Sequence, residues 1–278
     1  MAARKKTGSG SAKRRGASGA LTHDDIMGLA VRPDPELRRR SELLWEDRTR
    51  GTRGPKPGFA PDDVVRAAVE IADTDGLAAV TMHAVASRLG LTTMALYRYF
   101  PNKETLLDAV IDAGTGSPPP RSAPRPDWRT ELKQWAHAKR ALLCARPWLA
   151  ELPFIAAPHG PNWLGWLEAI TDTLSRTGLN AADIGGALSI VDGYTRGASD
   201  TAVSLARARA RGITEAGWAA GVGADLGRAI GDLRFPKFAA LITAPSTGKP
   251  RTLDESFDFG LERVLDGIEL YVRSATAS

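Results

Sequence analysis

The feature that most constrains this chain is a pair of short helical patterns separated by one glycine turn. Thr81 suits an N-cap, and Gly90 ends the first pattern after about two helical turns. Thr92 then begins a second pattern that runs to Phe100. Two short helices joined in this way predict a helix-turn-helix.

The segments on either side have the composition of supporting helices. Pro61 suits a first helical position, and apolar residues recur at intervals of three and four until Gly76. Asn102 suits the N-cap of a further helix that ends near Gly114. We therefore expect a helix-turn-helix domain on a three-helix scaffold over residues 59–114, with a Pro-rich linker over 115–126.

The second helix of the pair carries more polar side chains than a core requires. Its apolar residues, Leu91, Ala95, Leu96 and Phe100, are expected to hold it on the scaffold. The residues left to face outward are Thr92, Thr93, Met94, Tyr97, Arg98 and Tyr99. Such hydroxyls and a guanidinium bind phosphates and base edges, and Lys103 at the start of the next helix adds positive charge. This pattern predicts binding to a major groove of DNA, although Tyr97 and Tyr99 could instead be half-buried packing residues.

The basic excess of the chain lies in its first 60 residues. They hold 14 Lys and Arg against 7 Asp and Glu, whereas the remainder is slightly acidic. Residues 1–58 therefore form a basic extension, predicted to be largely disordered with a short helix possible within 36–50. We expect Arg53 and Lys56 to add phosphate or minor-groove contacts; the alternative is a solvated leader that contacts nothing.

Helical patterns continue beyond the linker, in a larger domain over residues 127–278. Apolar stripes of helical period lie in 128–142, 163–178, 180–211, 214–230 and 254–273, and no segment has the alternation of a strand. The fold class is therefore all-α. The long 180–211 and 254–273 stripes, with glycines that permit close approach, predict a dimer interface formed by four helices.

Several functional classes find no support in the residues. Cys144 is the single cysteine and the four histidines are scattered, so we expect no metal and no cofactor. His137 and Cys144 are about two helical turns apart, too far for a nucleophile and its base, and no other catalytic set emerges. The missing catalytic set favours a protein that is not an enzyme. The chain lacks an apolar run that could span a membrane and an apolar leader, which favours a cytoplasmic protein without a membrane partner.

Residues 61–113 resemble the DNA-binding domain of the TetR family of bacterial transcriptional repressors. The resemblance rests on TMHAVASRLGL (81–91), TTMALYRYF (92–100) and NKETLL (102–107), with Tyr99 where many members have histidine. It implies that DNA is contacted by Thr81 and His83 and by Thr92, Thr93, Met94, Tyr97, Arg98, Tyr99 and Lys103. The closing stretch FDFGLERVLDGIELYV (257–272) is similar to that of the tetracycline-repressor-like branch, whose C-terminal domain binds ligands and dimerises.

The resemblance also implies sites in the C-terminal domain. Its tryptophans by themselves fit ordinary core packing; the resemblance favours a partly apolar effector pocket formed by Trp135, His137, Arg140, Trp148, Asn162, Trp163, Trp166 and Tyr194. A dimer interface is expected at Ile184, Leu188, Val191, Thr195, Phe257, Leu261, Val264 and Ile268. The expected function is that of a homodimeric repressor that a small molecule releases from palindromic operator DNA. The alternative is an architectural or partner-docking DNA-binding protein without an effector.

Overall fold

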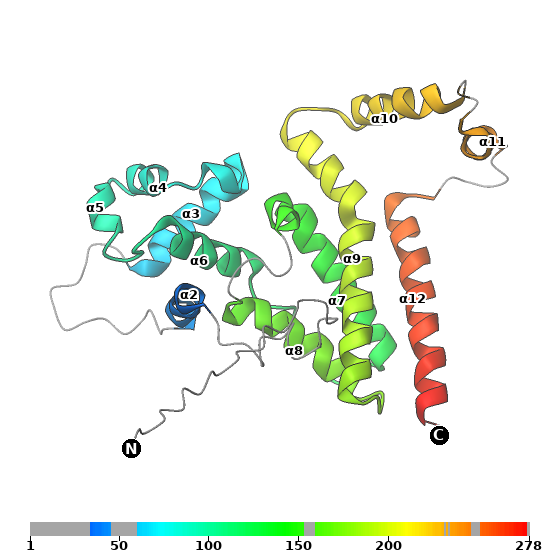
Figure 1. Ribbon diagram of the computed structural model, residues 1–278, viewed down its shortest axis with the longest axis horizontal. Helices are drawn as coiled ribbons and strands as arrows, with labels where there is room; N and C mark the ends of the chain where they lie inside the picture. Colours follow the sequence, from blue (N-terminus) through cyan, green and yellow to red (C-terminus); the bar gives the residue numbers. More distant parts are fainter. Residues whose placement is uncertain are drawn as a thin grey trace, which may run out of the picture. The chain divides into compact units, whose positions relative to one another are not determined.

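The computed structural model describes residues 34–45, 60–152, 159–230, 232, 234–245 and 251–276. The chain divides into two compact units, residues 1–39 and 40–278, and the architecture given below is that of the second unit. Its described residues form helices and turns without a strand, so the all-α prediction is confirmed for them (Figure 1).

The helices of the N-terminal half lie close to their expected positions. They are α2 (Pro35–Trp45), α3 (Pro61–Asp75), η1 (Leu77–Ala79), α4 (Met82–Arg88), α5 (Thr93–Leu96) and α6 (Lys103–Thr115). Caps set their limits: the side chains of Thr81, Thr92 and Asn102 accept backbone N–H groups at the starts of α4, α5 and α6. Gly76 has φ 86° and terminates α3, a conformation that favours glycine.

The C-terminal half contains longer helices. They are α7 (Trp128–Ala145), η2 (Pro147–Glu151), α8 (Pro161–Ser175), α9 (Ala181–Ala210), α10 (Glu215–Ile230), α11 (Pro236–Thr243) and α12 (Leu253–Thr276). α9 packs against α7, α8 and α12, and Figure 1 shows α9 and α12 side by side. The single long helix expected over 180–211 is therefore present, whereas η2 and α11 were not predicted.

Two clusters of buried apolar residues stabilise the unit. The first joins α3, α4, α5 and α6 to η2 and α9, with Trp148 and Val203 reaching it from the C-terminal half. The second lies among α7, α8, α9 and α12 and contains Trp135, Trp166 and Phe257. Within the described part of the chain, no helix combines the length and apolarity required to cross a bilayer.

Candidate nucleic-acid interface and effector domain

The helix-turn-helix is formed by α4 and α5. Gly90 has φ 66°, a left-handed conformation that favours glycine, and it turns the chain between the two helices. The N–H of Leu91 donates to the carbonyl of Ala86 at 2.9 Å, which closes the turn. Leu96 is fully buried and Phe100 is 5% exposed, so both anchor α5 to the scaffold as expected. The α-helical part of α5 ends at Leu96 and a tighter turn continues to Tyr99.

The side chains predicted to face DNA are mostly exposed. Met94 is 75% exposed and Tyr97 is 43% exposed, so both side chains are accessible for the predicted contact with DNA. Tyr99, by contrast, is half-buried against the apolar cluster, which supports a packing role for its ring. Exposed positions also include Thr92 and Arg98, while Thr93 is half-buried.

The remaining expected contacts flank this face. His83 is exposed on the first turn of α4, and Lys103 is the half-buried first residue of α6. The hydroxyl oxygens of Thr81 and Thr92 accept backbone N–H groups at 3.0 and 3.2 Å, so their O–H groups can still donate to phosphate. Arg53 and Lys56 lie outside the described residues.

α6 connects this domain to the C-terminal half. The carboxylate of Asp112, 7% exposed, accepts from the amide Nδ2 of Asn162 at 3.0 Å and from the backbone N–H of Trp163 at 3.1 Å. Gly160, the N-cap of α8, makes no side-chain cap, and a Cβ there would clash with this carboxylate. Asp112 therefore caps α8 from another helix, which ties α6 to α8.

Further side-chain contacts hold α3 and α6 to their neighbours. The side chain of Arg146 donates to the carbonyl of Gly114 at 2.9 Å and to Asp73 at 3.1 Å, and the indole N–H of Trp148 donates to Asp73 at 2.8 Å. Arg40 of α2 pairs with buried Asp108 through two hydrogen bonds of 2.6 and 2.7 Å. Burial raises the pKa of Asp108, and the hydrogen bond from Arg40 opposes this rise.

The eight residues expected in an effector pocket fall into different environments. Trp135 and Trp166 pack edge to face at 5.8 Å inside the domain. Trp148 lies in the first apolar cluster, Asn162 is held by Asp112, and Tyr194 donates to the carbonyl of Phe257 at 2.7 Å. The ring of Trp163 lies 3.7 Å from that of His159 between centroids, with a tilt of 39°.

His137 and Arg140 are separated from the tryptophans. They line a pocket of about 640 Å³ on the side of α7 that faces α10 and α12, together with Leu205, Glu215 and Asp254. The eight residues therefore do not form one pocket. The helical period explains this result, because Trp135 and His137 are two positions apart and point to different sides of α7.

Comparison with known proteins identifies the family. A model described as "Bacterial regulatory proteins, tetR family" matches residues 64–110, and one described as "Tetracyclin repressor-like, C-terminal domain" matches residues 120–272. The HTH-type transcriptional repressor DrrR1 of Streptomyces coeruleorubidus is 36% identical over 240 residues, which are 85% of this chain and 87% of that protein. The chain belongs to the TetR family.

A further relative agrees with this assignment, and two solved structures share the fold. Tetracycline repressor protein class A from transposon 1721 of Escherichia coli is 33% identical over 50% of this chain and 64% of that protein. Apo ActR from Streptomyces coelicolor superposes with a TM-score of 0.61 at 23% identity, over 80% of this chain and 100% of ActR. The ActR complex with actinorhodin gives 0.61 at 24% identity, over 78% of this chain and 99% of ActR. As a TetR-family regulator, the chain is a DNA-binding transcription factor.

The surface that this TetR-family chain offers to a second copy differs from the expected one. Five of the eight residues predicted at the interface are at most 6% exposed: Val191, Thr195, Phe257, Leu261 and Ile268. The other three, Ile184, Leu188 and Val264, pack partly buried against the second apolar cluster. The five buried side chains therefore belong to the core of the subunit, and for them the prediction is corrected. The three partly buried residues stay a prediction. A periodic stripe shows that a helix face is covered, but not which surface covers it.

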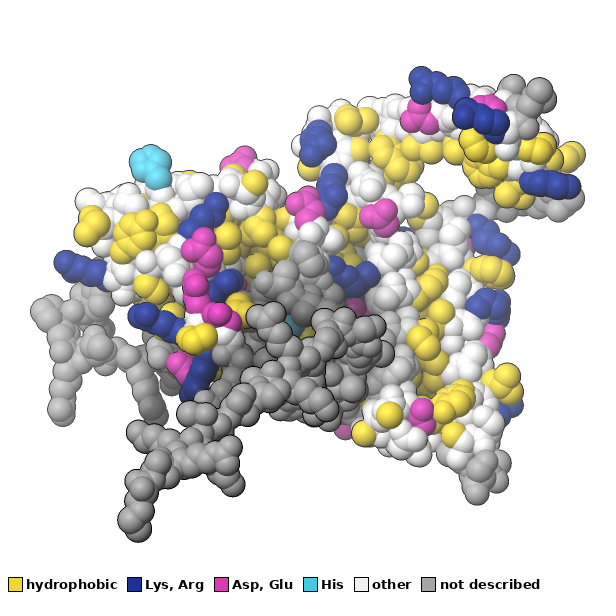
Figure 2. Space-filling view, in the orientation of Figure 1, with side chains coloured by type: hydrophobic (Ala, Val, Ile, Leu, Met, Phe, Trp, Pro, Cys, Tyr) yellow, Lys and Arg dark blue, Asp and Glu magenta, His cyan; other side chains and the backbone are white. Residues whose placement is uncertain are grey.

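The outward faces of the same helices carry other residues. On α9, Ile190 is 54% exposed, and a Cβ at Gly186, Gly193 or Gly197 would meet no atom within 4 Å. On α12, Phe259 is 46% exposed and Leu270 is 69% exposed. Figure 2 shows hydrophobic side chains gathered along α10, α11 and α12.

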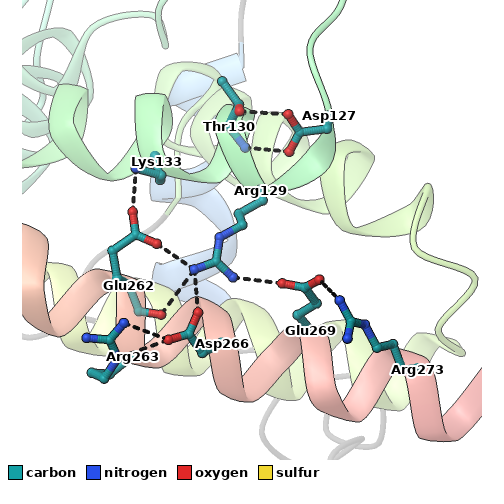
Figure 3. Close-up of polar contacts among 9 residues, drawn as sticks. All are labelled: Asp127, Arg129, Thr130, Lys133, Glu262, Arg263, Asp266, Glu269 and Arg273. Atoms are coloured by element: carbon teal, nitrogen blue, oxygen red, sulfur yellow. Dashed lines mark hydrogen bonds and ion pairs between the residues drawn. The ribbon is translucent and has the colours of Figure 1, made fainter.

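Ion pairs hold α12 by its inner side. The guanidinium of Arg129 on α7 lies among Glu262, Asp266 and Glu269 of α12 (Figure 3). Lys133, one turn further along α7, also pairs with Glu262. α12 is thus fixed against its own subunit, and its outer face stays exposed.

Two buried charged residues of the domain were not predicted from its sequence pattern. Lys139 and Asp192 are each 7% exposed. The sequence contained a signal for Lys139, because it lies four residues after Trp135 and seven after Leu132, on the apolar side of its helix. A charged side chain on a buried helix face is rare unless it pairs with an opposite charge or binds a ligand.

Proposed function

We propose that this protein is a homodimeric repressor that binds a palindromic operator and leaves it when a small molecule binds the C-terminal domain. The observation that carries the DNA-binding part is the exposed polar face of α5 on a buried scaffold. Two copies would place their α5 helices in successive major grooves, about 34 to 36 Å apart.

The dimer would form through the outer faces of α9 and α12. Gly186, Gly193 and Gly197 form a smooth stripe on α9 that permits close backbone approach, and Phe259 and Leu270 supply apolar area on α12. An isologous pairing of both helices buries these faces and leaves α5 of each subunit free. Family members act as dimers, which supports this arrangement.

An effector is favoured over the alternative of an architectural protein without one. ActR, which shares this fold, has been crystallised with actinorhodin. The contacts of α6 with α8, through Asp112, provide a route by which a change in the C-terminal domain reaches the DNA-binding domain. An effector acts only through its difference in affinity for the DNA-bound and free conformations.

The DNA-binding part is tested with matched variants on a palindromic site selected from random DNA. Arg98→Ala removes an exposed cation from the proposed interface, whereas Arg228→Ala removes one from α10, where Arg228 is paired with Asp225 at the surface. We expect Arg98→Ala to weaken operator binding by on the order of 1 to 3 kcal/mol. Arg228→Ala should bind as the wild type does. Equal affinities for all three proteins would refute the assignment of α5.

A further inference from the structure

Two opposite charges lie largely buried between α7, α8 and α9, without an ion pair or a hydrogen bond to hold them. Lys139 on α7 and Asp192 on α9 are each 7% exposed. Within the described residues, neither side chain makes a hydrogen bond or an ion pair within 4.0 Å, and their charged atoms keep a small accessible surface. The ammonium of Lys139 lies 5.1 Å from the ring centroid of Trp166.

This arrangement is electrostatically unfavourable as it stands. Burial lowers the pKa of Lys139 and raises the pKa of Asp192, and each charge partly offsets the shift of the other. Arg196 acts on both groups as a second cation, and its guanidinium donates to the carbonyl of Leu152 at 3.1 Å. The centre of the domain thus holds two cations and one carboxylate. Buried charges that lack direct hydrogen bonds destabilise a fold, so a polar group between them would be strongly held.

The aromatic wall beside this centre is fixed at both ends. The indole N–H of Trp135 donates to the carbonyl of Trp166 at 3.0 Å, and the indole N–H of Trp166 donates to the carbonyl of Gly116 at 2.9 Å. Gly116 immediately follows α6. A molecule against Trp166 therefore lies one hydrogen bond from the end of the helix that connects to the DNA-binding domain.

We propose that Lys139 and Asp192 are the polar anchors of the effector site, and that the effector is an aromatic compound with one acidic oxygen beside a hydroxyl group. The acidic oxygen accepts from Lys139 and balances the excess positive charge that Arg196 contributes. The hydroxyl donates to Asp192, and the ring packs on Trp166. This inference rests on the proposed function, whose effector it describes by chemical class.

The test uses 3-hydroxy-2-naphthoate as probe, with 3-hydroxy-2-naphthamide as the neutral comparison and 2-naphthoate as the acid without the hydroxyl. Binding to the full-length protein is measured by isothermal titration calorimetry. We expect the hydroxy acid to bind at least tenfold more tightly than either comparison compound. Lys139→Met should abolish the preference for acid over amide, and Asp192→Asn should abolish the preference for the hydroxyl. Lys133→Met, an equal charge change on the side of α7 where Lys133 pairs with Glu262 of α12, should keep both preferences.

Stability separates a binding role from a structural one. If the pair is retained for binding, the double variant Lys139→Met/Asp192→Asn should unfold at a urea midpoint no lower than that of the wild type without probe. A clearly lower midpoint would show that the pair is structural and would overturn the proposal. So would equal affinity of the wild type for the hydroxy acid and its amide, or an unchanged preference in Lys139→Met.

Operator binding is measured on the same samples, so that a failure of the inferred effector site can be distinguished from a failure of the proposed function. A protein that binds its operator without any preference for the acid refutes the inference about the site and leaves the DNA-binding function standing. A protein that prefers the acid but binds no palindromic DNA refutes the proposed function. Release of operator DNA by the hydroxy acid in the wild type, lost in Lys139→Met, would support both.

Discussion

Asp112→Ala should destabilise the protein more than any exposed charge removal, because Asp112 caps a helix to which it does not belong. α8 begins at Pro161 after Gly160, which has no side chain to accept the first N–H groups. The Asp112 carboxylate performs that task and is 7% exposed. The alanine variant leaves the N–H of Trp163 and the amide of Asn162 without this acceptor.

The size of the effect follows from these contacts. A hydrogen bond to a charged group contributes about 1.5 to 3 kcal/mol, and a negative charge at a helix N-terminus adds about 0.3 to 1 kcal/mol. The hydrogen bonds share one carboxylate, and water enters the space that alanine leaves, so the contributions do not add fully. We expect Asp112→Ala to lower the free energy of unfolding by about 2 to 4 kcal/mol. Asp112→Asn keeps an acceptor but loses the charge, and should cost about 1 kcal/mol.

Urea denaturation followed by circular dichroism at equal protein concentration measures these differences. The matched control is Asp225→Ala, because the Asp225 side chain is 74% exposed on α10. It should change the free energy of unfolding by no more than about 0.5 kcal/mol. If Asp112→Ala were as stable as this control, the cap across the two domains would contribute nothing and the reasoning would be refuted.

Three further predictions concern assembly, the extension and pH. Leu270→Asp should give a soluble monomer in sedimentation experiments, whereas Leu261→Asp, in the subunit core, should unfold the protein; a dimeric Leu270→Asp protein would place the interface elsewhere. A chain that begins at Phe59 should bind operator with a shallower slope of log affinity against log salt concentration than the full chain. The slope should fall in magnitude by roughly 0.9 for each lost phosphate contact. Equal slopes and affinities for the two proteins would exclude the extension from binding. The hydrogen bond from Arg125 lowers the pKa of Glu131 from 4.5 to about 2, so its contribution is present above pH 4.5 and lost as the pH falls through 2. Glu131→Gln should therefore show a smaller decrease in unfolding free energy between pH 5 and pH 2 than the wild type, and parallel pH profiles would refute this assignment.

Local rules acting on neighbouring residues determined much of this protein. Pro61, Thr81, Thr92 and Asn102 begin helices where they were expected to, and Gly90 turns the chain between α4 and α5. These features depend on caps and dihedral preferences, which involve residues within about four positions of one another. The class of the fold and the position of the helix-turn-helix could be predicted for the same reason.

Only the tertiary structure decided which surfaces meet. Phe257 and Leu261 form an apolar stripe that fits a subunit core and a dimer interface equally well, and the packing of α12 on α9 assigned it to the core. The spacing of Lys139 from Leu132 and Trp135 indicated a covered face, but only the packing of α8 and α9 showed what covers it. The sequence of α6 does not reveal that Asp112 caps α8, which follows from the approach of that helix. Hydrophobic periodicity records that a face is covered, whereas the partner that covers it depends on contacts between residues far apart in the chain.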